Sequence, residues 1–198
     1  GVTSEPPAAP NFVWFEMPYF DKLSDDSREG MMAVLDALGG QVERLDAGEP
    51  FIGLVESQNI IHHYEIARNL VKIRENHNDT LSPQMSRLMA YGATISDDAY
   101  QEAIELRNGA VSYFATFFND FDAIITPSAP GEAPLVSAGG TGNPIFSTVW
   151  TYCGMPSISL PLLQGANKLP IGIQLVSSLY DDERLFRNAS WLTKKIKA

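Results

Sequence analysis

The chain has 198 residues and a formal net charge of −10, with 44% hydrophobic and 19% charged residues. This composition is typical of a globular chain long enough for one sizeable core. The acidic balance argues against a nucleic-acid partner, because negative charge repels phosphate backbones, and no run of about 18 apolar residues indicates a membrane span.

The first part of the chain, residues 11–46, predicts a strand, a helix and a second strand. The run NFVWFEMP is short, apolar and ended by proline, which is typical of a buried strand. A helix follows, with Ser24 as its cap and Gly39 at its end. The alternating segment QVERLD completes a unit of βαβ size, so we expect a parallel strand pair.

Residues 50–119 are expected to be mostly helical. The stretch from Pro50 to His77 begins with proline and repeats apolar residues every three or four positions, which predicts one long helix. Ser82 with Pro83 marks the start of a second helix. Ser96 with two aspartates marks the start of a third, which extends to about residue 119.

The final part, residues 120–198, changes in character. A short strand at 123–126 leads into a loop of about 20 residues that is rich in proline and glycine, and a loop of that length is usually functional or mobile. Two more strands are expected in MPSISLPLL and PIGIQLVSS. An amphipathic helix closes the chain, acidic at its start and basic at its end. We expect the three parts to form a single unit of the α/β class.

No cofactor and no metal ion are expected, because three histidines and one cysteine form no cluster with metal-ligand spacing. The single cysteine favours a reducing compartment, hence a cytoplasmic location. The first ten residues lack the basic and apolar regions of a signal peptide.

Several residues invite a catalytic interpretation, and each has a plainer one. Cys153 has no histidine near it in sequence and is expected to be a small buried residue. Ser157 and Ser159 alternate with apolar residues, which indicates a strand with one face that is polar or lines a cavity, rather than a G-x-S-x-G nucleophile turn. Adjacent His62 and His63 are expected on a helix surface or at a helix contact.

The remaining candidates are short motifs. The aspartate pairs at 97–98 and 181–182 are expected to start helices rather than to form a catalytic dyad. The loop GGTGNP could cradle an anion with its N–H groups, but it lacks the phosphate-loop pattern, and a pocket-edge loop is the favoured interpretation. The residues alone therefore give no complete catalytic constellation.

Three stretches of the last third resemble the amidase signature family. They are DAIITPSAPGEAP, TGNPIFSTVWTYCGMPSISLPL and LPIGIQLVSSLYDDERLF, in the order the family shows. The resemblance implies the C-terminal portion of that fold, with a partial mixed sheet of about five strands flanked by helices. It also implies a hydrolase acting on carbon–nitrogen (amide) bonds.

The family's Ser–cis-Ser–Lys triad has no counterpart in this sequence. Its nucleophile lies in a segment Gly-Gly-Ser-Ser-Gly-Gly, whereas the glycine pairs here, at 39–40 and 139–140, are not followed by serines. Since the mechanism needs an activated serine, we expect no catalytic residue in these 198 residues and no amidase activity from them alone. The alternative is a non-catalytic relic or a binding or oligomerisation module.

By position, the resemblance implies that the long loop and the helix after it line a substrate pocket. The implied residues are Pro127, Ser128, Ala129, Thr141, Gly142, Phe146 and Trp150. The expected ligand is a small-molecule amide, once an N-terminal half completes the site. A part of a larger fold exposes apolar faces, so we also expect a homodimer or a complementary chain as partner.

Overall fold

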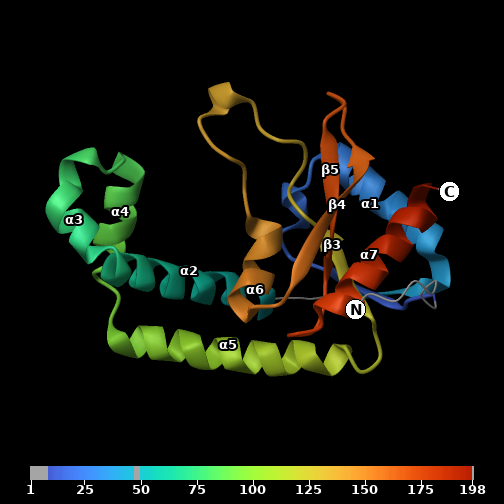
Figure 1. Cartoon of the computed structure of the whole chain (residues 1–198), viewed down its shortest axis with the longest axis horizontal. Coiled ribbons are helices and arrows are strands. Elements are labelled where there is room, and N and C mark those ends of the chain that lie inside the picture. The colour runs from blue at the N-terminus through green and yellow to red at the C-terminus, as the bar shows by residue number, and fades with distance from the viewer. Residues whose placement is uncertain (1–8, 47–49, 198) are drawn as a thin grey trace.

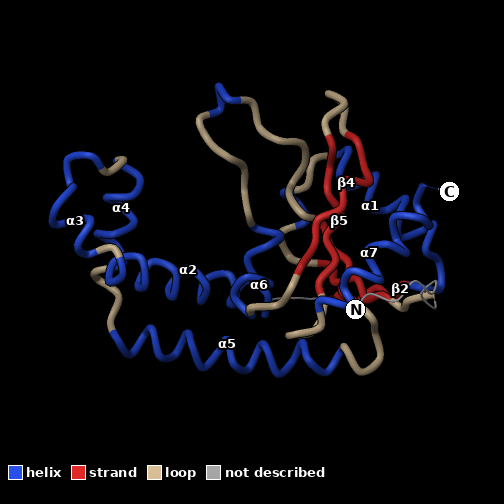
Figure 2. The backbone as a smooth tube through the Cα atoms, in the orientation of Figure 1, coloured by secondary structure: helices blue, strands red, loops and turns tan. Residues whose placement is uncertain are grey.

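The computed structural model describes residues 9–46 and 50–197, which form a mixed five-stranded sheet flanked by helices (Figures 1 and 2). The α/β class and the five-stranded sheet are therefore as predicted. The strands are β1 (Phe12–Glu16), β2 (Val42–Asp46), β3 (Ala123–Pro127), β4 (Ser157–Gln164) and β5 (Pro170–Val176). The α-helices are α1 (Asp25–Leu38), α2 (Pro50–Asn69), α3 (Val71–His77), α4 (Pro83–Gly92), α5 (Asp97–Phe117), α6 (Ile145–Cys153) and α7 (Asp182–Lys197).

The strand order in the sheet is β2-β1-β3-β5-β4. Strand β1 runs parallel to β2 and to β3, which confirms the expected parallel pair, and β5 runs antiparallel to β3 and β4. Strands β4 and β5 are joined by a short turn, and β4 forms an edge of the sheet. The last two strands therefore make a hairpin beside the parallel part.

Each face of the sheet has its own helical layer. Figure 1 shows α1 and α7 on one side of the sheet and α2, α5 and α6 on the other. The register aligns Ile125, Leu175 and Ile158 on the face of α1 and α7. The opposite face carries Phe15 of β1, whose ring lies 5.7 Å from the ring of Phe51 in α2.

Helix α1 forms as its sequence predicts. The Ser24 hydroxyl accepts a hydrogen bond from the Ser27 N–H, which caps the first turn, and acidic residues follow it. The apolar positions at three- and four-residue spacing are buried. Gly39 ends the helix with φ of 55°, a conformation that glycine adopts without a steric penalty.

The middle of the chain forms a helical arm that extends away from the sheet. In Figure 1, α2 and α5 run side by side and α3 and α4 lie at the far end of the arm. The long helix predicted from Pro50 to His77 is wrong in one respect, because the chain breaks at Leu70, where φ is −101° and ψ is 12°. No proline or glycine marks this break, so the helical pattern alone could not reveal it.

None of the helices in the described ranges is both long and apolar enough to cross a membrane.

Candidate functional site

A cleft of about 640 Å³ lies between the long loop after β3 and the β4–β5 hairpin. The loop occupies residues 128–144 and stands away from the sheet in Figure 1. From the loop side the cleft is lined by residues 128–134 and 141–144, and from the hairpin side by Ser159, Pro170 and Gly172. Helix α6 begins directly after the last loop residue that lines it.

Two hydroxyl groups meet at the floor of the cleft. The side-chain oxygens of Ser128 and Ser159 lie 2.7 Å apart, and either can donate the hydrogen bond. The Ser128 N–H also donates to the Gly172 carbonyl at 3.1 Å. A Cβ added to Gly172 would lie 2.6 Å from the Ser128 oxygen and would also overlap the Ser159 oxygen, so glycine keeps this floor open.

A polar row continues from this floor into the core. Thr126, Gln174 and Ser159 lie opposite one another on β3, β5 and β4, and therefore share a face of the sheet. Thr126 and Gln174 are buried, and within the described residues the Thr126 hydroxyl and the Gln174 carbonyl oxygen have no hydrogen-bond partner. Unpaired buried polar groups are uncommon because they cost free energy.

The first limb of the loop is anchored at several points. The Glu132 carboxylate accepts hydrogen bonds from the N–H and side-chain amide of Asn167 and from the N–H of Leu169, at 2.8 to 3.1 Å. The Pro130 carbonyl accepts a hydrogen bond of 2.8 Å from the Ser24 N–H, at the start of α1. The hairpin turn and α1 thus hold this limb in place.

The second limb of the loop projects into solvent. Leu135 and Val136 are 76% and 96% exposed, which is unusual for aliphatic side chains. Gly139 and Gly142 have φ of 71° and 107°, conformations that favour glycine. These two exposed side chains lie between the two loop stretches that line the cleft, and do not line it themselves.

The residues proposed from sequence as a pocket wall divide into two groups. Ser128, Ala129, Thr141 and Gly142 line the cleft together. The other three, Pro127, Phe146 and Trp150, are buried. Phe146 and Trp150 fix α6 against the core, where the Trp150 ring lies 5.2 Å from the ring of Phe114. The part that all seven play in binding a substrate stays a prediction.

Comparison with known proteins identifies the family. A family model described as Amidase matches residues 33–186, which is well over half of the chain. This chain belongs to the amidase signature family. The match includes α6, the β4–β5 hairpin and the whole cleft loop, so the cleft lies within the part of the chain that defines the membership.

Similar proteins agree with this membership. A glutamyl-tRNA(Gln) amidotransferase subunit of Ehrlichia ruminantium is 28% identical over 150 residues, covering 71% of this chain and 29% of the relative. A crystal structure of an amidase superposes with a TM-score of 0.83 at 21% identity, covering 98% of this chain and 47% of that one. A structure described as a vestigial protein complex related to an s-triazine catabolic enzyme superposes with a TM-score of 0.79 at 19% identity, covering 94% and 43%. The chain spans less than half the length of each.

The thiol of this amidase-family chain is in an unreactive state. Cys153 is buried at the end of α6, and burial raises the pKa of its thiol to about 12, with Arg107 opposing part of that rise. A thiol with so high a pKa stays protonated near neutral pH and is a poor nucleophile. The expectation of a buried cysteine is confirmed.

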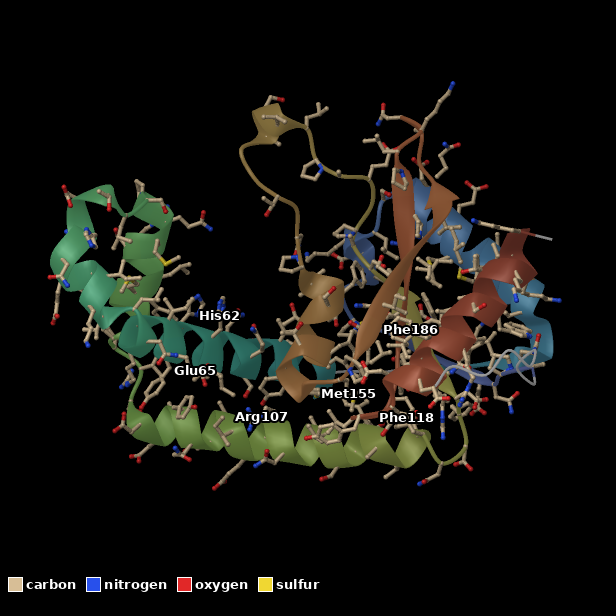
Figure 3. All side chains as sticks on the ribbon, viewed as in Figure 1. His62, Glu65, Arg107, Phe118, Met155 and Phe186 are labelled. Atoms are coloured by element: carbon tan, nitrogen blue, oxygen red, sulfur yellow. The ribbon has the colours of Figure 1, made fainter. Side chains whose placement is uncertain are left out.

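The histidines and serines also take the plainer roles. Figure 3 shows His62 on α2, well away from Met155, which follows Cys153 by two residues. Ser157 and Ser159 are exposed on one face of β4, as their alternation predicted. The described residues hold no group of three or more acidic, histidine or cysteine side chains placed to bind a metal ion.

Sequence reasoning missed three contributors to the cleft. Ser159 was identified on a strand face that is polar or lines a cavity, but it was not included among the residues of the substrate pocket. Gly172 and Glu132 were not singled out. The Gly-x-Gln pattern of β5 was a signal for Gly172, but the register of β4 against β5, which brings Ser159 beside it, is a property of the folded hairpin.

Proposed function

We propose that this chain forms the substrate-pocket wall of an amidase-family hydrolase acting on carbon–nitrogen bonds. The observation that carries this proposal is the cleft, where the Ser128 and Ser159 hydroxyls lie side by side and where alanine and proline side chains form much of the remaining lining. Pockets for small molecules usually combine apolar walls with a few fixed polar groups. A hydroxyl can both donate and accept, which suits the N–H and carbonyl of an amide.

In this proposal the reacting groups come from outside these residues. The family resemblance requires a serine activated through a lysine, and none of the serines here has that sequence context. Cys153 is protonated and buried, so it does not replace the missing nucleophile. A complementary polypeptide segment or chain would supply the reacting groups in a cytoplasmic protein, whereas a second copy of this chain would only cover exposed apolar faces. Hydrolysis by the chain alone is not expected.

A non-catalytic role is the second candidate. The absence of a triad counterpart in the sequence favours it, as does the similarity to a structure described as a vestigial complex. A relic that binds a partner would keep the fold, and its cleft would not need to bind an amide. The two candidates therefore differ in whether the cleft binds small amides.

Titration of the ¹⁵N-labelled chain with benzamide tests the proposal. We expect the backbone signals of Ser128, Ser159 and Gly172 to shift, and Ser159→Ala to weaken binding. Ser157→Ala is the matched control, since Ser157 lies two residues away on the same exposed face of β4 but does not line the cleft. No saturable shift at the cleft, or equal losses in both variants, would favour the non-catalytic candidate.

A further inference from the structure

A second pocket, of about 630 Å³, lies at the other end of α6 from the cleft. Its walls come from α5, from the last turn of α6 and from the segment between β5 and α7. Arg107, Cys153 and Tyr180 are among the residues that line it, and none of its residues lines the cleft. The cleft and this second pocket are therefore separate sites at opposite ends of α6.

Arg107 brings to this pocket a positive charge that takes part in no ion pair within the described residues. The other partly buried arginines in the described ranges have carboxylate partners: Arg184 pairs with Asp181, and Arg187 with Glu183, both at 2.9 Å. Arg107 is also partly buried, yet it forms no ion pair or hydrogen bond with any described residue. Within the described residues, Arg107 is thus the partly buried arginine that lacks an acidic partner, in a chain with 24 acidic and 14 basic residues. Figure 3 shows Arg107 on α5, on the side facing α6.

Tyr180 gives the pocket an aromatic rim. Its φ is 64°, a left-handed conformation that is uncommon for a large residue, and its side chain is 96% exposed. Backbone in such a conformation costs free energy and is found preferentially at binding sites. The strained backbone thus holds an unburied aromatic ring at the edge of the pocket that contains Arg107.

The charge of Arg107 acts on the pocket wall. Burial raises the pKa values of both Tyr152 and Cys153, and the positive charge of Arg107 lowers them in part. The guanidinium therefore lies close enough to influence both groups, one of which is 4% exposed.

We propose that this pocket binds a small carboxylate with an apolar or aromatic body. A guanidinium pairs with a carboxylate through two parallel hydrogen bonds, and Tyr180 offers a surface for the apolar part. Asp182 also lines the pocket. Its negative charge favours a monoanion over a doubly charged phosphate, because like charges repel at short range.

The experiment is a titration of the ¹⁵N-labelled chain with 3-phenylpropionate and with its neutral counterpart 3-phenylpropan-1-ol. Neither compound is an amide, so binding at the proposed amide cleft does not enter the result. We expect the carboxylate to shift the backbone signals of Asn108 and Tyr180, and the alcohol to do so at least roughly tenfold more weakly. Equal binding of the two compounds, or no binding of the carboxylate, would overturn the proposal.

Variants locate the site. Arg107→Gln is expected to reduce the affinity for phenylpropionate about tenfold or more, and Arg107→Lys to retain part of it, since lysine keeps the charge but not the planar fork. Arg87→Gln on α4 is the control, because Arg87 is exposed and lines neither pocket. Tyr180→Gly removes the exposed ring and relieves the strained φ, so weaker binding by this variant would not reflect a damaged fold. Benzamide binding at the cleft is measured separately on the same samples. Unchanged affinity of Arg107→Gln for phenylpropionate would contradict the proposal.

Discussion

The hydroxyl oxygens of Ser128 and Ser159 lie 2.7 Å apart, where the loop after β3 meets the edge strand β4. This contact joins two segments that are 31 residues apart in sequence. It forms only because β5 has glycine at position 172, between them. The floor of the proposed amide pocket therefore depends on three residues from three different segments.

Replacing Gly172 by alanine should damage this floor. The added methyl group would overlap both hydroxyl oxygens, and overpacking of this kind costs roughly 1–3 kcal/mol. Urea unfolding measures the loss, and benzamide titration should show weaker binding. Gly53→Ala on α2 is the control, because nothing lies within 4 Å of its added Cβ. Alanine in a helix stabilises the folded state by up to about 1 kcal/mol relative to glycine. Equal stability of the Gly172→Ala protein and the wild type would refute the close packing.

Glu132→Ala should release the first limb of the cleft loop. The carboxylate holds three hydrogen bonds to the turn between β4 and β5, and their loss is expected to cost about 1–3 kcal/mol locally. Hydrogen exchange should become faster at the Asn167 and Leu169 amides, which donate these bonds. Glu105→Ala on α5 provides the comparison, since Glu105 is exposed and forms no hydrogen bond or ion pair with the described residues. Unaltered exchange at both amides would show that Glu132 does not anchor the loop.

Tyr152→Phe should weaken the attachment of α6 to the helical arm. The Tyr152 hydroxyl lies 2.7 Å from the Ser57 hydroxyl on α2 and donates to the Ala103 carbonyl on α5, also at 2.7 Å. Because these groups are buried, removing the hydroxyl leaves partners poorly satisfied, at a cost of about 1–3 kcal/mol. Thermal unfolding measures the change. Tyr113→Phe, at an exposed tyrosine, should change stability by less than about 0.5 kcal/mol, and a similar loss in both variants would argue against the network.

The buried thiol of Cys153 predicts a pH dependence of stability. Folding raises its pKa from 9.0 to about 12, so the native state holds this proton more tightly than the unfolded chain. The free energy of unfolding should therefore fall as the pH rises from 9 towards 12. Cys153→Ala removes this contribution. Over the same pH range the free energy of unfolding of the variant should therefore fall less than that of the wild type, by on the order of 1–3 kcal/mol. Parallel pH profiles for wild type and variant in urea unfolding would contradict the raised pKa.

Much of the fold follows from local sequence signals. Ser24, Ser82 and Ser96 each precede a helix, and each hydroxyl accepts a hydrogen bond from the N–H three residues later. Alternation along β4 placed Ser157 and Ser159 on one face. These features involve contacts within one or two turns, so residue spacing is enough to find them.

The break at Leu70 and the composition of the cleft depend on contacts between distant segments. Nothing in the sequence around Leu70 interrupts the helical pattern, yet the chain turns there to bring α4 against α2. The close approach is visible at Gly92, where an added Cβ would collide with the His63 carbonyl. In the same way, Ser159 and Glu132 join the cleft through strand register and a hairpin turn, which no local pattern encodes.

We propose above that this chain provides a pocket wall and not the nucleophile. The most direct test is to incubate the purified chain with benzamide and to follow protein and ligand signals together by NMR. We expect saturable shifts at the cleft floor while benzamide remains intact. Saturable conversion of benzamide to benzoate and ammonia by this chain alone, abolished by Cys153→Ala or Ser157→Ala, would contradict it.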